Sequence, residues 1–178
     1  MGKIVNSTFV SLDGVINHMD RWHFDFVDAE SDALTLRQLR AADAMLMGRR
    51  TYEIYATAWP GRNGEYADLI NAMPKYVAST TLTDPAWAGT TVLDGDLVEA
   101  VTTVKKGQDI LMHGYGPVAK TLVRHGLIDE LYLWVHPMLA GTGTTDDMLI
   151  SAGLNTRLTL LDATKLGSGV VILSYRAN

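Results

Sequence analysis

The sequence predicts one α/β domain over residues 1–178, with a mainly parallel central sheet, helices on both faces and antiparallel strands at its C-terminal edge. Three observations lead to this prediction. Short apolar runs alternate with segments of helical periodicity. The run 44–47 is uninterrupted and stops at Gly48, which is typical of a strand buried on both faces. The last two apolar segments, 158–161 and 170–175, are joined through 167–169 without a crossover helix, as in a hairpin.

Local signals justify each element. The predicted strands span 4–10, 44–47, 76–78, 91–93, 110–112, 131–135, 158–161 and 170–175. The predicted helices span 28–42, 51–58, 66–72, 97–105 and 117–125. Pro60 and Pro74 follow the ends of the second and third helices. Pro117 suits the first turn of the last helix, and Gly126 suits its C-terminal end.

Composition excludes several classes of protein. The chain has no cysteine, which excludes a disulfide framework, a cysteine-based zinc site and a cysteine nucleophile, and which favours a reducing, cytoplasmic setting. The formal net charge of −5 argues against nucleic-acid binding. No apolar run approaches the ~18 residues that cross a membrane, and we expect no signal peptide at the N-terminus. The five histidines show no metal-binding spacing, so we expect no bound metal.

The turn Gly48-Arg49-Arg50-Thr51 is the first candidate site. It directly follows a buried strand and opens a helix, where free N–H groups and the helix dipole attract anions. An arginine side chain binds phosphate through two parallel hydrogen bonds, and Thr51 either caps the helix or bonds the phosphate. The alternative interpretation is that both arginines are solvated surface charges beside a turn glycine.

Two further turns follow strands in the same way. The segment His113-Gly114-Tyr115-Gly116-Pro117 opens a second helix, and its glycines allow close approach of a ligand, although a plain tight turn is an equal alternative. Ser79-Thr80-Thr81 offers small hydroxyl groups that bind a phosphate or ribose, or that only form the turn. Two such junctions in one sheet favour a dinucleotide, which carries phosphates several ångströms apart.

The segment before and within the first helix holds the candidate substrate residues. Asp32 shares a helical face with Leu36 and Leu39, so it faces a pocket or serves the helix N-terminus; the same two interpretations apply to Asp28. Trp22 and His23 either line a pocket or contribute packing. Asp13-Gly14 is a strong turn signal at the end of the first strand.

Taken in order, these segments resemble the dihydrofolate reductase superfamily, and most closely its branch similar to the C-terminal reductase domain of the bifunctional riboflavin-biosynthesis enzyme RibD. The most specific match is Met-Gly-Arg-Arg-Thr-Tyr-Glu at 47–53. The other matching segments are 11–16, 75–79, 110–118, 127–131, 136–137 and 167–175. The chain departs from the family at His113, where a second glycine is usual, and it carries no deaminase signature.

The resemblance implies a three-layer dihydrofolate-reductase-like fold and NADPH as hydride donor. It implies that Gly48, Arg49, Arg50 and Thr51 hold the phosphates and that Ser79, Thr80 and Thr81 lie at the 2′-phosphate end. It further places the pyrophosphate at the 113–118 turn. The residues of that turn are His113, Gly114, Tyr115, Gly116, Pro117 and Val118.

The resemblance also locates the reacting groups. It places the nicotinamide beside the backbone near Asp13 and Ile16, and the substrate pocket between residues 11–32 and the sheet. Asp32 falls, by spacing from Gly48, where dihydrofolate reductases place their substrate-binding acid, so it is the candidate catalytic residue. The candidate substrate-binding residues are Trp22, His23, Asp28 and Asp32.

The predicted function is an NADPH-dependent reductase of a small heteroaromatic, carbonyl or imine substrate. The named activity that fits best is reduction of 5-amino-6-(5-phosphoribosylamino)uracil in riboflavin biosynthesis. Dihydrofolate reduction is the enzymatic alternative, and a nucleotide-binding protein of the same fold without turnover is the alternative of another class. The resemblance implies a homodimer, and the alternation at 131–135 fits burial under either a helix or a dimer partner.

Overall fold

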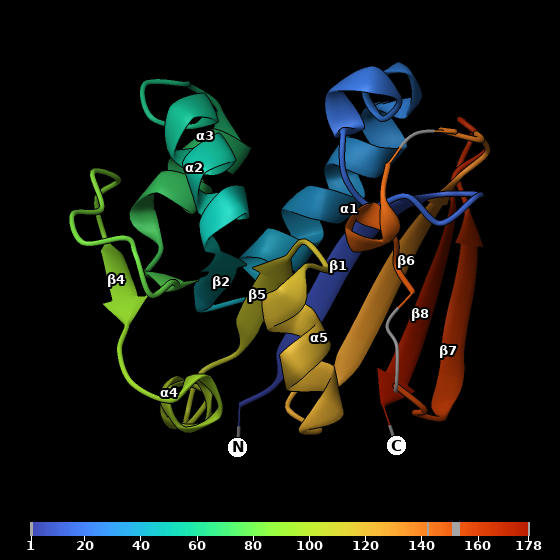
Figure 1. Ribbon diagram of the computed structural model, residues 1–178. Helices are drawn as coiled ribbons and strands as arrows, with labels where there is room; N and C mark the ends of the chain where they lie inside the picture. Colours follow the sequence, from blue (N-terminus) through green and yellow to red (C-terminus); the bar gives the residue numbers. More distant parts are fainter. Residues whose placement is uncertain (1, 142, 151–153, 178) are drawn as a thin grey trace.

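The computed structural model describes residues 2–141, 143–150 and 154–177. Within these residues eight strands form one sheet in the order β4-β3-β2-β5-β1-β6-β8-β7 (Figure 1). The strands are β1 (Ile4–Ser11), β2 (Ala44–Gly48), β3 (Lys75–Ala78), β4 (Thr90–Leu93), β5 (Ile110–His113), β6 (Glu130–His136), β7 (Leu158–Lys165) and β8 (Val171–Ala177). The helices are α1 (Ala29–Arg40), α2 (Arg49–Ala58), α3 (Glu65–Ala72), α4 (Leu97–Val104) and α5 (Pro117–Arg124), with short 3-10 helices η1 (Met19–Arg21), η2 (Phe24–Phe26) and η3 (Thr145–Asp147).

The sheet is parallel from β4 to β6 and antiparallel at β8 and β7. This arrangement confirms the predicted fold class, including the hairpin-like return at the C-terminal edge. β1 lies between β5 and β6, although it comes first in the sequence. The carboxyl ends of β1, β2 and β5 therefore meet at one edge of the sheet, where ligands bind in sheets of this type.

Helices cover both faces of the sheet, with α1 and α5 on opposite sides (Figure 1). Neighbouring residues of β1 serve different faces: Ile4 packs with α4 and α5, whereas Val5 packs with α1, α2 and α3. A third cluster covers the β6–β8 end and joins Trp134 to Phe9 and Phe26. This alternation follows from the two-residue period of a strand buried on both sides.

Capping explains where the helices begin. Asp28 is the N-cap of α1 and forms a capping box with Ser31, and the Asp96 side chain caps α4. Helix α2 begins at Arg49, two residues before the predicted start, because Gly48 is its N-cap. Arg49 and Arg50 are therefore part of the first helical turn.

Strand β6 buries Leu131 and Trp134 within the subunit, whereas Tyr132, Leu133 and Val135 are half-buried. Trp134 is 1% exposed and packs edge-on against Phe9 of the neighbouring β1. Its indole Nε1 donates to Ser7 Oγ at 2.9 Å. The alternation at 131–135 was explained by burial either within the subunit or against a dimer partner. Trp134 is buried within the subunit, so its side chain gives no support to a dimer interface.

Candidate functional site

The turns that follow β2 and β5 meet at the carboxyl edge of the sheet. These strands are adjacent and parallel, but α2 packs on one face of the sheet and α5 on the other. The chain therefore leaves the two strands in opposite directions, and in open α/β sheets ligands bind at such a switch point. We call the place where 48–51 and 113–118 meet the switch-point crevice.

The two turns touch. Gly114 has φ +83°, and a Cβ atom placed on it would lie 2.8 Å from the Thr51 hydroxyl oxygen. On the other side, a Cβ on Gly48 would lie 3.4 Å from a methyl group of Val118. The structure thus brings together the two sequence segments that were predicted to bind the phosphates of one ligand.

The helices that begin at this crevice have no side-chain cap. Helix α2 starts at Gly48 and α5 at Gly116, and neither residue can supply a capping hydrogen bond. In α1 and α4, by contrast, an aspartate already occupies the helix start. The crevice therefore presents two helix N-termini whose N–H groups and dipoles are available to an anion.

Arg49 links the crevice to the turn after β3. Its guanidinium donates to the Thr81 hydroxyl and, through Nε, to Glu53 Oε1 at 2.7 Å. The Ser79 hydroxyl accepts from the backbone N–H groups of Thr81 and Leu82, at 3.2 and 3.0 Å, and so shapes that turn. The predicted 2′-phosphate residues thus lie beside Arg49, with Thr80 and Thr81 exposed.

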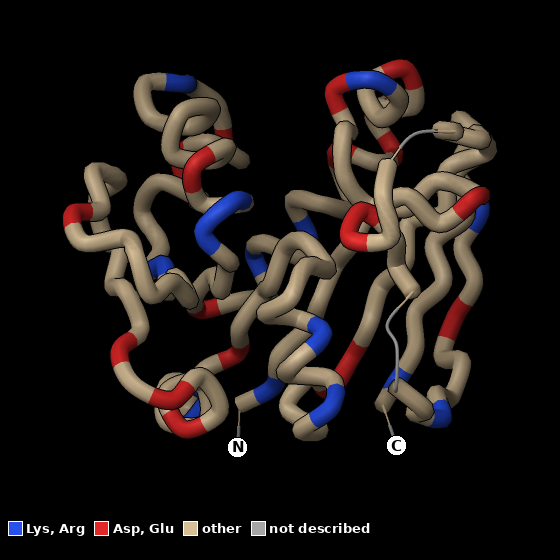
Figure 2. The backbone as a smooth tube through the Cα atoms, viewed as in Figure 1, with Lys and Arg blue, Asp and Glu red and all other residues tan. Residues whose placement is uncertain are grey.

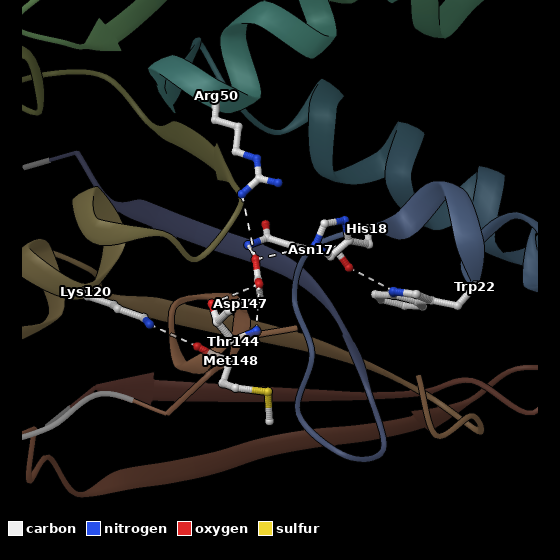
Figure 3. A network of polar contacts seen from close by, with 8 residues as sticks. All are labelled: Asn17, His18, Trp22, Arg50, Lys120, Thr144, Asp147 and Met148. Atoms are coloured by element: carbon white, nitrogen blue, oxygen red, sulfur yellow. Dashed lines mark hydrogen bonds and ion pairs between the residues drawn. The ribbon is translucent and has the colours of Figure 1, made fainter. Parts of the chain in front are cut away.

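Arg50 points toward a segment that sequence reasoning did not select (Figure 3). Its Nη1 lies 3.9 Å from Asp147 Oδ1, which also accepts from Asn17 Nδ2 at 2.7 Å and lies 3.8 Å from His18 Nε2. The other oxygen, Oδ2, accepts from the Thr144 N–H at 2.9 Å. Hydrogen bonds, chiefly from Thr144, lower the pKa of Asp147 to about 2, so it is ionised at neutral pH.

Asp147 thereby fixes residues 143–150 across the end of β1. The Ile16 N–H donates to the Asp147 carbonyl at 2.8 Å, and the Leu149 N–H donates to the Gly14 carbonyl at 2.8 Å. Figure 2 shows acidic residues at η3 and basic residues at the start of α2. The Thr-x-x-Asp spacing at 144–147, a capping-box pattern, is the sequence signal that would have found this segment.

Asp13 closes the neighbouring loop. Its carboxylate accepts from Ser11 Oγ at 2.5 Å and from the N–H groups of Ala140 and Gly141 at 3.0 and 2.8 Å. These bonds, first of all the one from Ser11, lower the pKa of Asp13 to about 2. The carboxylate is thus bonded within the protein, Ile16 is buried, and the predicted place of the nicotinamide beside their backbone stays a prediction.

An aromatic cluster fills the space between residues 17–28 and the sheet. Trp22 is 2% exposed, and its Nε1 donates to the Asn17 carbonyl at 2.9 Å. His23 stacks on Phe9 with ring centroids 4.1 Å apart, and its Nδ1 lies 2.9 Å from His136 Nε2. Burial lowers the pKa of His23 to about 4, so this pair is neutral at pH 7. Trp22 is therefore enclosed, whereas His23 keeps partial exposure.

The two candidate acids of α1 lie at its N-terminus. Asp28 accepts from the Ser31 N–H at 2.8 Å, and this bond lowers its pKa. Asp32 is exposed in the first turn, whereas Ser31 and Leu39 are the buried residues of the helix. Within the described residues, neither acid makes a contact with the residues of the switch-point crevice. Their role in substrate binding stays a prediction.

His113 turns its side chain toward α2. Its Nδ1 lies 2.8 Å from the hydroxyl of Tyr55, and the two rings meet edge-on. Sequence reasoning placed His113 in the crevice but could not identify Tyr55, which lies a turn beyond Thr51 on the same helix.

Comparison with known proteins agrees with this architecture. The sequence model of the RibD C-terminal domain family matches residues 2–172. The chain belongs to the RibD C-terminal domain family. The match covers nearly the whole chain, which confirms the resemblance that the collinear motifs predicted.

Individual relatives are distant in sequence. The uncharacterised protein YyaP of Bacillus subtilis is 26% identical over 99% of this chain and 95% of its own length. A putative riboflavin biosynthesis protein from Shewanella sp. PV-4 superimposes with a TM-score of 0.74 at 22% identity, covering 100% of this chain and 99% of that one. RibD of Acinetobacter baumannii gives a TM-score of 0.70 at 14% identity over 100% of this chain and 58% of its own. These structures show that the family fold is shared.

The described residues show neither a helix that is long and apolar enough to cross a bilayer nor a group of three metal-binding side chains. The features of the crevice are the uncapped starts of α2 and α5, the paired arginines and the His113–Tyr55 contact.

Proposed function

We propose that this protein is a reductase that uses NADPH to transfer hydride to a small heteroaromatic, carbonyl or imine substrate. The observation that carries the proposal is the switch-point crevice, where two uncapped helix N-termini and two arginines meet. Such a donor set suits a ligand with several phosphates. The family match supports a reductase over other phosphate-binding proteins.

The residues present fit a dinucleotide phosphate. Gly48 and Gly114 let the two turns lie against each other, with Val118 beside Gly48 and Thr51 beside Gly114, so the starts of α2 and α5 are close enough to bind one ligand. The N–H groups at the starts of α2 and α5 would hold the pyrophosphate, and Arg49 with the 79–81 turn would hold the 2′-phosphate. When bound, NADPH supplies the hydride; the protein binds and orients it.

The substrate is proposed to be related to the pyrimidine of riboflavin biosynthesis, 5-amino-6-(5-phosphoribosylamino)uracil. The names of the Shewanella and Acinetobacter relatives support this choice. That substrate carries a phosphate of its own, and Arg50 is the cation free to meet it if Arg49 serves the cofactor. The Arg50 side chain is 64% exposed and holds Asp147 only at 3.9 Å, so a phosphate can compete for it.

The two alternatives make different demands on the site. Dihydrofolate reduction requires Asp32 to face the substrate, and the exposed position of Asp32 in the first turn of α1 does not favour it. A binding protein without turnover would use the same crevice and would lack only the reaction. We also propose that the protein is a cytoplasmic homodimer; light scattering of the purified protein tests the dimer.

The decisive experiment follows NADPH oxidation at 340 nm with the pyrimidine, dihydrofolate and a panel of carbonyl and imine substrates. Calorimetry with NADPH and NADH, without substrate, measures cofactor binding in parallel. Binding with turnover supports the reductase, and the substrate that is reduced identifies the class. Binding without turnover on any substrate favours the nucleotide-binding alternative, and absence of dinucleotide binding contradicts the proposal.

A further inference from the structure

His113 and Tyr55 place a polar pair at the edge of the switch-point crevice. His113 is the last residue of β5, directly before Gly114, and is the register partner of Ser7 on β1. Register partners point to the same face of a sheet, so His113 and Ser7 both face the side of α1 and α2. Tyr55 approaches from α2, with its hydroxyl 2.8 Å from His113 Nδ1.

Tyr55 determines which nitrogen of His113 carries the proton. Burial raises the pKa of Tyr55, so the phenol keeps its proton and needs an acceptor for it. Within the described residues, His113 Nδ1 is the hydrogen-bond partner of that hydroxyl. Tyr55 therefore donates to Nδ1, and the proton of the neutral imidazole sits on Nε2. Burial lowers the pKa of His113 to about 4, which keeps the ring neutral at pH 7.

The Nε2–H group is left available. Within residues 2–141, 143–150 and 154–177, Nε2 has no hydrogen-bond partner. In the same residues, the side-chain polar atoms that are both fully shielded from solvent (sealed) and without a partner are Thr90 Oγ1 and Ser168 Oγ. Nε2 is not one of these sealed atoms, and His113 as a whole is half-buried, so the Nε2 position keeps some access to solvent. The next residue, Gly114, lies at the switch-point crevice, where a Cβ placed on it would be 2.8 Å from Thr51 Oγ1.

We propose that His113 is a neutral hydrogen-bond donor to an oxygen atom of the ligand in the switch-point crevice, and that Tyr55 is the positioning residue that holds it in the donor form. The inference rests on the proposed function, since it assumes a ligand in that crevice. The oxygen belongs either to the dinucleotide or to the substrate carbonyl. A neutral N–H donor of fixed direction favours ligands that place a hydrogen-bond acceptor at this position, and it disfavours ligands that place a donor there.

The first test is nuclear magnetic resonance of the ring nitrogens in ¹⁵N-histidine-labelled protein without ligand. At pH 7 the wild type is expected to show His113 as the neutral Nε2–H form. Tyr55→Phe is expected to give a mixture of both neutral forms, because the group that fixes Nδ1 is gone. A wild-type ring that is charged, or protonated on Nδ1, overturns the inference whatever the protein binds.

The second test compares His113→Gln, whose amide nitrogen reaches the place of Nε2, with His113→Leu, which has no donor. His113→Leu is expected to weaken ligand binding about threefold to tenfold, and His113→Gln to restore it. A loss in the calorimetric affinity for NADPH assigns the oxygen to the cofactor. A raised KM with normal NADPH affinity assigns it to the substrate.

The outcomes separate this inference from the proposed function. If the wild type binds no NADPH, the proposed function fails. If the wild type binds it and His113→Leu matches the wild type in both affinity and KM, only this inference fails. Equal losses in the Gln and Leu variants also contradict it, because a shared loss reflects packing rather than donation.

Discussion

A Cβ atom on Gly114 would lie 2.8 Å from the Thr51 hydroxyl oxygen, so the turn after β5 can approach α2 only with glycine at this position. Its φ of +83° is also a conformation that side chains rarely adopt. We predict that Gly114→Ala lowers the free energy of unfolding by about 1–2 kcal/mol and weakens NADPH binding. Urea unfolding and calorimetry measure the two effects.

Gly116→Ala is the matched control. Gly116 has φ −78°, and no atom lies within 4 Å of a Cβ placed there. This variant is expected to keep the wild-type stability within about 0.5 kcal/mol. Equal destabilisation by both variants would contradict the contact between the turns.

The two arginines are predicted to differ in cofactor preference. Arg49 contacts Thr81 in the turn after β3, whereas Arg50 faces Asp147. Arg49→Ala is therefore expected to weaken NADPH binding about tenfold or more and NADH binding much less. Arg50→Ala is expected to leave the affinity for both dinucleotides close to that of the wild type, because Arg50 is proposed to meet the substrate phosphate. Calorimetry at two salt concentrations checks this; equal effects of Arg49→Ala on both dinucleotides would contradict the 2′-phosphate assignment.

Lys75 is predicted to matter for stability alone. It is fully buried at the start of β3, and its Nζ donates to the carbonyls of Asn71, Met73 and Ala88 at 2.9, 2.8 and 3.1 Å. Lys75→Met leaves these carbonyls unpaired and should cost about 3 kcal/mol in urea unfolding. NADPH affinity should not change, because the crevice lies at the opposite ends of the strands. Lys106→Met, at an exposed position, serves as the control and should be neutral.

Stability is predicted to fall in mild acid. Burial lowers the pKa values of His23 and His113 to about 4, below the ~6.5 of an unfolded chain. Between these pKa values the unfolded state binds more protons than the folded state. The stability that the folded protein gains from keeping both rings neutral is therefore complete above pH ~6.5 and is lost as the pH falls toward 4. Both rings are partly exposed, so we expect a loss of roughly 1–2 kcal/mol between pH 7 and pH 5.

Urea unfolding at a series of pH values measures this loss. His113→Asn should flatten the dependence, whereas His125→Asn, at an exposed position after α5, should leave it unchanged. A wild-type stability that is constant between pH 7 and pH 5 would show that both histidines can be protonated without penalty in the folded protein.

Asp147 is predicted to hold residues 143–150 in place. Asp147→Ala removes the acceptor of Asn17 and Thr144, so the amide hydrogens of Thr144 and Leu149 should exchange about tenfold faster. Asp146→Ala changes an exposed neighbour and should leave exchange as in the wild type. Unchanged exchange in Asp147→Ala would mean that backbone bonds alone fix the segment.

The strands, the helices and the positions of the turns at 48–51 and 113–118 could be predicted because their signals are local. An apolar run that stops at Gly48, or a proline at 117, determines structure within a few residues. The switch-point crevice followed from placing these signals in one sheet. The family motifs added the order of the segments, and the match over residues 2–172 confirms it.

The remaining contacts join residues that are far apart in the sequence, and no local pattern encodes them. Periodicity placed Asp32 on a face with Leu36 and Leu39, but in α1 the buried residues are Ser31 and Leu39, and Asp32 at the edge of that face is exposed. For the same reason, neither the Tyr55–His113 pair nor the Asp147–Arg50 pair could be predicted.

The central position of β1 also affects how the chain folds. This first strand pairs with β5 and β6. Its partners in the sheet, residues 110–113 and 130–136, are therefore synthesised long after β1 itself. Until then its apolar residues must be kept from wrong partners. Such distant pairing gives a high contact order, which slows folding. Expression at low temperature or with added chaperones should therefore raise the soluble yield.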